Sequence, residues 1–181
     1  ELFPDVKIKL TNHSTKQAVN ALKAGLVDFA VVTTPVNLTN DMKSESLCSF
    51  NDILIAGPKY KQLCNKALHL EELQEYPFIS LVEGTGTHDH YTKFFYDNDL
   101  HFNLDMEAST TDQVLAMVQS NLGLGFYPEQ LASEYIMRGE IFPVSLHESV
   151  PERDIILIRE SRHAENIAAK KLINFLKHTT N

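Results

Sequence analysis

The sequence has little of what marks the more specialised classes of protein. It holds two cysteines and no tryptophan in 181 residues. Two cysteines cannot build the disulfide framework of a small secreted domain, so we interpret Cys48 and Cys64 as free thiols in a reducing compartment. No apolar run approaches the roughly 18 residues that a membrane span needs, and no signal peptide is visible at the N-terminus. These absences predict a protein of the cytoplasm that does not act at a membrane.

Positive charge is also scarce, and motifs for catalysis are missing. Lysine and arginine total 16 against 24 aspartates and glutamates, so the formal net charge is -8. A surface that binds nucleic acid normally has a basic patch, so this sequence is not expected to bind DNA itself. The sequence contains no Gly-x-Ser-x-Gly elbow, no His-Glu-x-x-His and no P-loop. It therefore predicts neither an enzyme nor a bound cofactor.

What is present is an alternation of short apolar strands with helices of about ten residues. This order predicts an α/β fold made of βαβ units with a parallel sheet. Gly25 and Asn121 stand where two helices must end in a left-handed residue. Residues 35–46 are interpreted as a polar loop. Strands are predicted at 6–10, 28–34, 51–57, 77–82, 103–108, 123–128 and 153–160, and a strand or extended segment at 141–146.

Hydroxyl and glycine residues gather where three of the predicted helices begin. The three stretches are "NHSTK", "EGTGTH" and "ASTTD". In open α/β sheets, ligands bind outside the carboxyl ends of the strands, where helix N-termini offer free N–H groups and a positive dipole end. The sequence therefore predicts a site for a small polar ligand at these loops. Each hydroxyl has an alternative role as a helix cap.

Several motifs, taken in order, resemble one known family. "FPDVKIKL…STKQAVNALKAGLVDFAVV" is similar to the start of the effector-binding domain of LysR-type transcriptional regulators. "EELQEYPFISL" resembles the entry to that family's second subdomain, and "QSNLGLGFYP" resembles a further signature, with Asn121 in place of its first glycine. The matching positions are Phe3, Pro4, Val6, Leu22, Gly25, Asp28, Leu73, Pro77, Phe78, Gly123, Gly125 and Pro128.

The resemblance implies a periplasmic-binding-protein type II-like fold of two Rossmann-like subdomains joined by two crossover strands. Residues 1–50 and 153–181 would form regulatory subdomain I, without the strand and helix that usually open it. Residues 51–152 would form subdomain II. A small polar effector would bind in the cleft between them and pass a change to a winged helix-turn-helix domain that is absent from this chain. A solute-binding protein of a transporter is the alternative.

The resemblance also implies a homodimer, with a tetramer in the full-length regulator. The dimer would pair the helix around Ala18–Lys23 with the helix around Phe94 and Phe95. The aromatic residues Tyr91, Phe94 and Phe95 are otherwise interpreted as core. DNA would be bound only through the missing N-terminal domain.

The effector site expected from the loops and the resemblance includes residues of both subdomains. Tyr127 has core packing as an alternative, and Glu83 has a solvated charge. His88-Asp89-His90 is interpreted as a solvated helix start rather than a metal site, because residues two apart do not share a helix face. The expected effector contacts are Ser14, Thr15, Thr33, Thr34, Glu83, Gly84, Thr85, Thr87, Ser109 and Tyr127.

Overall fold

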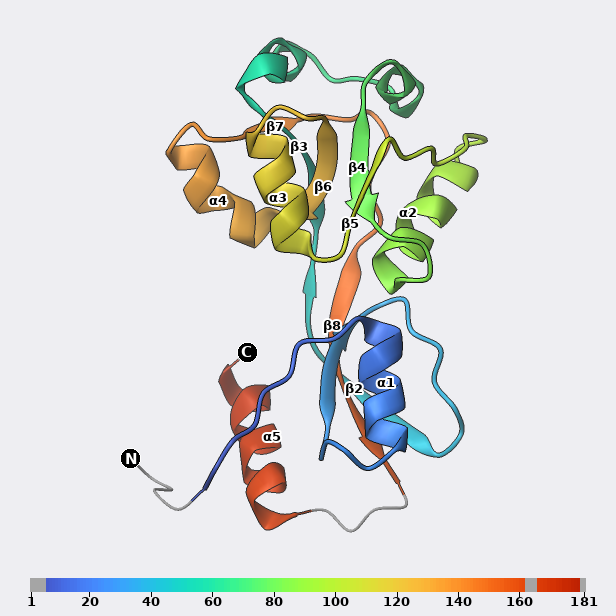
Figure 1. Ribbon diagram of the computed structural model, residues 1–181, viewed down its shortest axis with the longest axis vertical. Helices are drawn as coiled ribbons and strands as arrows, with labels where there is room; N and C mark the ends of the chain where they lie inside the picture. The colour runs from blue at the N-terminus through green and yellow to red at the C-terminus, as the bar shows by residue number, and fades with distance from the viewer. Residues whose placement is uncertain (1–5, 162–165, 180–181) are drawn as a thin grey trace. The chain divides into compact units, whose positions relative to one another are not determined.

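The structure is a computed structural model that describes residues 6–161 and 166–179, and its contacts divide the chain into two units (Figure 1). The first unit contains residues 1–49 and 154–181, and the second contains residues 50–153. The chain therefore passes between the units twice, next to Phe50 and next to Arg153. Each unit has its own sheet.

The first unit is built on a three-stranded sheet with the strand order β1-β8-β2. β1 pairs with β8 in antiparallel orientation. The core of this unit lies between α1 and the sheet and includes Val19, Leu22, Val32 and Ile158. Its elements are α1 (Thr15–Lys23), β1 (Ala30–Thr33), β2 (Met42–Phe50), β8 (Arg153–Glu160) and α5 (Ile167–Thr179).

Local sequence explains the limits of α1. Ser14 precedes the helix, and its hydroxyl accepts a hydrogen bond from the N–H of Gln17 while the Gln17 side chain accepts one from the N–H of Ser14. This reciprocal cap satisfies two N–H groups that the helix leaves unpaired. After the helix, Gly25 has φ 66°. The predicted left-handed helix end is therefore confirmed.

An ion-pair network attaches α5 to the sheet of the first unit. The Glu45 carboxylate on β2 contacts both Arg159 on β8 and Lys177 on α5. The hydrogen bond from Lys177, together with the charges of both cations, holds the pKa of Glu45 below its usual value. The network therefore joins β2 to β8 and α5, which follow it more than 100 positions later in the sequence.

The second unit is built on a five-stranded sheet with the order β5-β4-β6-β3-β7. β4 is parallel to β5 and β6, whereas β3 is antiparallel to β6 and β7. The expected parallel pairing is confirmed for β4 with β5 and β6 and is wrong for β3, which follows the first chain crossing and is antiparallel to both of its neighbours. The elements are β3 (Asp52–Ala56), the 3-10 helices η1 (Pro58–Asn65) and η2 (Leu70–Glu75), β4 (Phe78–Leu81), α2 (Gly86–Tyr96), β5 (Met106–Ala108), α3 (Thr111–Gln119), β6 (Leu124–Pro128), α4 (Glu129–Met137) and β7 (Phe142–Val144).

Helices cover both faces of this sheet, with α2 on one face and α3 and α4 on the other (Figure 1). Successive side chains of a strand therefore enter different cores. Phe78 packs with Phe94 and Phe95, whereas Ile79 packs with Val118. Because Phe94 and Phe95 are each 3% exposed, the interpretation of these residues as core is confirmed. The expected dimer contact through the helix around them stays a prediction.

The glycines of "NLGLGFYP" allow close packing between strands and α3. A Cβ on Gly123 would lie 2.4 Å from the carbonyl oxygen of Pro77, and one on Gly125 would lie 3.0 Å from that of Ile79. Only glycine fits at the first distance, and at the second a side chain would force the neighbouring atoms to shift. Asn121 has φ 62°, as the sequence predicted, and its side-chain oxygen accepts a hydrogen bond from the N–H of Lys59 at 2.7 Å.

Two sequence expectations fail in the first unit. Residues 6–10 alternate apolar and polar but form no strand, and Leu10 is 92% exposed. A strand needs a partner edge, and none of the described residues pairs with this segment. The predicted polar loop at 35–46 ends inside β2 (Met42–Phe50), which buries only its two terminal residues. The residues between them are mostly polar and lie toward solvent, so the sequence shows no apolar alternation that would predict a strand.

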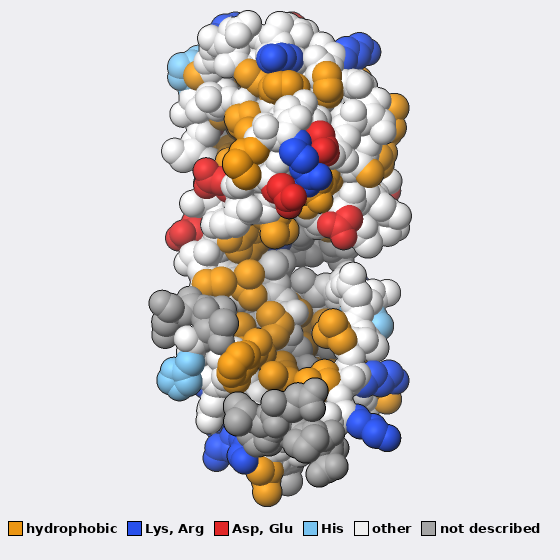
Figure 2. Space-filling model, turned by 90° about the vertical axis from the view of Figure 1, so that its left-hand side faces the viewer, with side chains coloured by type: hydrophobic (Ala, Val, Ile, Leu, Met, Phe, Trp, Pro, Cys, Tyr) orange, Lys and Arg blue, Asp and Glu red, His pale blue; other side chains and the backbone are white. Residues whose placement is uncertain are grey.

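The surface of the second unit mixes charges of both signs. In the middle of the upper part of Figure 2, acidic and basic side chains lie side by side. Arg138, next to α4, pairs with Glu134 and Glu140. Of the helices in the described part of the chain, none is long and apolar enough to cross a membrane.

Candidate functional site

In the second unit, the parallel register brings two of the predicted loops to one edge of the sheet. Leu81 at the end of β4 lies opposite Ala108 at the end of β5. The loop that contains residues 83–85 follows β4, and Ser109 follows β5, so both loops leave the sheet at the same edge (Figure 1). α2 and α3 begin there with free N–H groups and the positive end of the helix dipole. This edge can hold an anion or a neutral polar group.

The hydroxyl of Thr85 caps the start of α2. It accepts a hydrogen bond from the N–H of His88 at 3.2 Å and donates one to the carbonyl of Val82 at 2.9 Å. Thr85 is only 8% exposed. Gly84, with φ 81°, and Glu83 are exposed. In this loop, the groups open to a ligand are therefore the backbone at Gly84 and the Glu83 carboxylate.

Thr87 belongs to a buried polar cluster. Its hydroxyl accepts a hydrogen bond from Nη2 of Arg153 at 2.9 Å. Nη1 of Arg153 lies 3.1 Å from Oδ2 of Asp52, and the two side chains are 4% and 1% exposed. The guanidinium carbon of Arg153 lies 5.2 Å from the centre of the Phe50 ring. One cation thus joins α2, the first residue of β3 and the last residue of β2.

Two aromatic side chains of α2 adjoin this cluster and stay uncharged at neutral pH. Burial, with a smaller contribution from the Arg153 charge, lowers the pKa of His90 to about 4. Burial and the nearby Asp52 carboxylate raise the pKa of Tyr91 well above its usual value. The cluster therefore holds one cation and one carboxylate among neutral groups.

The expectation that His88 and His90 are solvated is wrong. The His88 side chain is 17% exposed, and its ring lies 5.7 Å from that of Phe102. Nε2 of His90 is buried. The helix start contributes to the core because α2 packs across the sheet from its first turn.

α3 begins with a second capping box. The Thr110 hydroxyl accepts from the N–H of Gln113 at 3.3 Å, and Oε1 of Gln113 accepts from the N–H groups of Thr110 and Ser109. The predicted cap is confirmed at Thr110. Ser109 is exposed. Its N–H is already bonded at 2.8 Å, so the hydroxyl is the group that it can offer to a ligand.

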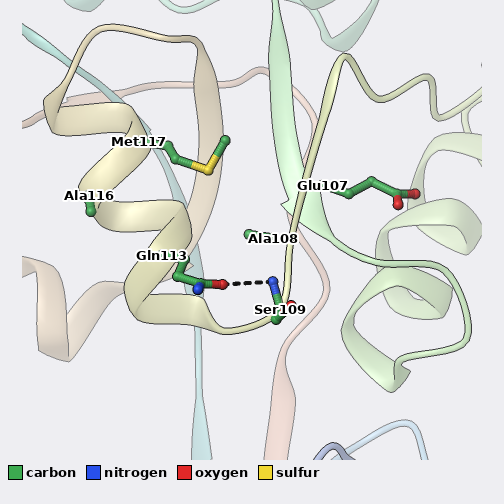
Figure 3. A pocket seen from close by; sticks show the side chains of 6 residues that line it. All are labelled: Glu107, Ala108, Ser109, Gln113, Ala116 and Met117. Carbon is green, nitrogen blue, oxygen red and sulfur yellow. Dashed lines mark hydrogen bonds between the residues drawn. The ribbon is translucent and has the colours of Figure 1, made fainter.

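A pocket of about 420 Å³ lies between α3 and β5, the edge strand of the sheet. Figure 3 shows Gln113 and Met117 reaching toward it from α3, while the Glu107 carboxylate lies on the other side of β5. The walls combine apolar and polar residues in equal number, with one amide, one hydroxyl and one acidic residue among them. The lining residues are Glu107, Ala108, Ser109, Gln113, Ala116 and Met117.

In the first unit, the expected effector contacts lie at one end of the sheet, because α1 runs antiparallel to β1 and begins where β1 ends (Figure 1). The Thr34 hydroxyl accepts a hydrogen bond from the N–H of Asp154 at 2.9 Å. The Ser14 hydroxyl is part of the α1 cap. Thr15 and Thr33 are half-buried at the helix start and the strand end. Thr15 therefore offers the helix-start hydroxyl that the cap does not use.

Tyr127 lies in the core of the second unit. It is 2% exposed on β6 and packs in the core that α3 and α4 cover. Burial raises the pKa of its hydroxyl. Core packing, one of the two alternatives for this residue, is what the structure shows. A contact of Tyr127 with an effector stays a prediction.

Sequence reasoning missed Asp52 and Arg153. Asp52 opens "DILIA", which is otherwise apolar, and Arg153 opens "RDIILIRE", which has an apolar centre. A charge in such a strand needs a buried partner, and this was the available signal. Their pairing spans 101 positions of the sequence, so no local pattern connects them.

The comparison with protein families covers the whole sequence. Residues 1–181 match the family described as the LysR substrate binding domain. The chain therefore belongs to this family, and the resemblance found in the sequence motifs is confirmed. This membership favours a regulator over the solute-binding protein of a transporter.

Curated relatives are transcriptional regulators. The chain is 29% identical over 124 residues to the HTH-type transcriptional regulator CysB of Haemophilus influenzae, a match that covers 68% of this chain and 38% of the relative. It is 27% identical over 123 residues to the HTH-type transcriptional activator CmpR of Synechocystis, with 67% and 40% covered. The chain thus spans about two fifths of the length of these relatives.

Solved structures confirm the predicted fold. The regulatory domain of Synechocystis PCC6803 CcmR in complex with 2-PG superposes with a TM-score of 0.87 at 13% identity, covering 99% of this chain and 86% of that chain. The effector binding domain of QuiR in complex with shikimate gives 0.85 at 16% identity, covering 99% and 84%. The fold is that of the LysR effector-binding domains, which is periplasmic-binding-protein type II-like.

Proposed function

We propose that this chain is the effector-sensing part of a LysR-type transcription factor that works in the cytoplasm. A small polar molecule binds at the strand-end loops, with contacts from both units, and changes how a separate DNA-binding domain engages DNA. Only a ligand with different affinities for two arrangements of the chain can shift their balance. The full-length protein forms homodimers and tetramers. Family membership over residues 1–181 carries this proposal.

The groups at the sheet edges support a hydroxylated or carboxylated effector. The starts of α2 and α3 offer N–H groups, and Thr15 and Ser109 offer hydroxyls that their helix caps do not use. Exposed Glu83 suits a donor group on the same ligand. Shikimate, which QuiR binds, is a hydroxylated carboxylic acid of this kind. Such a ligand pairs its acceptors with helix starts and its hydroxyls with side chains.

A thermal-shift screen of the chain tests this proposal. The panel contains shikimate, 2-PG, other small carboxylates, amino acids and amino sugars. A hit is repeated with Thr15→Val and with Ser109→Ala, which remove one hydroxyl from each unit without touching a cap. Ser133→Ala is the matched control, because its hydroxyl bonds within α4 to the carbonyl of Glu129.

Loss of the shift in both hydroxyl variants, with the shift intact in the control, supports contacts from both units. A shift that survives both variants contradicts the proposed site. The same hit is then added to the full-length regulator on its promoter DNA. An unchanged DNA footprint contradicts the proposed sensing role.

A further inference from the structure

We propose that Arg153 is a positioning residue that couples the first turn of α2 to both points where the chain passes between its two units. The guanidinium contacts three segments: the end of β2 at Phe50, the start of β3 at Asp52 and α2 at Thr87. Phe50 and Arg153 are the residues of the second unit at which the chain enters and leaves it. A shift of α2 therefore acts on both crossings through one side chain.

The geometry makes this connection stiff. A guanidinium is planar, and its two terminal nitrogens point in fixed directions. In Arg153 one nitrogen holds the Asp52 carboxylate at 3.1 Å and the other holds the Thr87 hydroxyl at 2.9 Å. Asp52 and Arg153 are 3% and 4% exposed, so water is not available to replace the bond between them, and Thr87 is half-buried. Movement of Thr87 must either break its bond or displace the guanidinium from Asp52.

The energetics of buried ions favour a role beyond packing. A buried ion pair is commonly no more stabilising than an apolar pair of the same volume, because both charges lose their hydration. Here the pair lies beside the buried aromatic residue Tyr91. An apolar pair would fill this space equally well but would leave the Thr87 hydroxyl without a partner. The ion pair thus gives α2 a directional attachment to the crossings.

The consequence for sensing rests on the proposed function. The first turn of α2 belongs to the edge at which the effector is proposed to bind. A ligand that draws this turn toward itself would change the bond from Arg153 to Thr87 and so reposition the segments at Phe50 and Arg153. The coupling itself needs no ligand and is tested without one.

The test is hydrogen–deuterium exchange on the ligand-free chain, compared among single variants. Thr87→Val removes the acceptor and keeps the shape, whereas Thr87→Ser keeps the hydroxyl. Thr92→Val is the matched control, because its hydroxyl lies on α2 and contacts His88 rather than Arg153. Amides of residues 49–54 and 153–156 report the crossings. Amides of α4 are the internal reference for general loss of stability.

We expect Thr87→Val to raise exchange at both crossings about 10- to 100-fold, the effect of losing one hydrogen bond to a charged group. Thr87→Ser restores the wild-type rates, and Thr92→Val changes only α2. Faster exchange confined to residues 82–92, or an equal rise in α4, overturns the proposal.

Arg153→Lys gives a second measurement. An ammonium keeps the charge opposite Asp52 but cannot reproduce the two-armed contact. The double variant Thr87→Val/Arg153→Lys should exchange no faster at the crossings than Arg153→Lys alone. Additive effects would show that Thr87 acts on the crossings by another route and would refute the coupling. Because no ligand is present, a failed effector screen leaves this outcome unchanged.

Discussion

Removing the Arg153 charge should cost the chain far more stability than removing any surface arginine. In Arg153→Met, the Asp52 carboxylate stays buried at 3% exposed with no opposing charge, and the Thr87 hydroxyl loses its donor. Breaking a buried pair from one side costs about 3–5 kcal/mol, because the remaining ion is neither hydrated nor paired. We therefore expect the free energy of unfolding at pH 7 to fall by about that amount.

Urea unfolding followed by far-UV circular dichroism measures this loss, since the sequence has no tryptophan to report it. Arg138→Met is the control: its side chain is 50% exposed beside Glu134, and such surface pairs contribute at most about 1 kcal/mol. The double variant Asp52→Leu/Arg153→Met removes both charges and should recover most of the loss. A single variant that loses less than about 1 kcal/mol, or a double variant no better than the single, would refute the argument from buried charge.

Three further outcomes follow from the described contacts. Burial lowers the pKa of His90 to about 4, so below pH 6.5 the folded chain binds fewer protons than the unfolded chain, and stability falls as the pH drops. Between pH 7 and pH 5 we expect the free energy of unfolding to fall by about 1 kcal/mol, a value already halved because His90 is partly exposed. Urea titrations of His90→Gln should not show this loss. Gly123→Ala should lower stability by about 2–3 kcal/mol in the same assay, because its Cβ would meet the Pro77 carbonyl at 2.4 Å; an unchanged melting temperature would contradict this packing. Thr110→Ala should cost about 1 kcal/mol by removing the α3 cap, with Ser133→Ala as control; equal losses in both would show that the cap contributes nothing special.

The sequence determined the local structure wherever the signal is local. Helix starts at Ser14 and Thr110 are marked by capping boxes, and helix ends at Gly25 and Asn121 by residues that accept positive φ. These choices depend on bonds between residues at most five positions apart. The order of motifs was sufficient to identify the family.

The same reasoning failed where a strand depends on its neighbours. Residues 6–10 have the alternation of a strand but no partner among the described residues, whereas Met42–Phe50 lacks the alternation and is a strand because it adjoins β8. Strand pairing is a contact between distant segments, so a period-two pattern is neither necessary nor sufficient. The direction of β3 and β8 is likewise set by where the chain crosses between units.

For the candidate site, the sequence supplied the residue types and the tertiary structure decided their roles. Hydroxyls after strands could be found in the sequence, but whether each one caps a helix or binds an arginine depends on what lies beside it. Thr85 is used by the start of α2, and Thr87 by Arg153, a residue 66 positions away. The ion pair of Arg153 with Asp52 exists only because folding brings the two ends of the second unit together, out of water, where each charge requires the other.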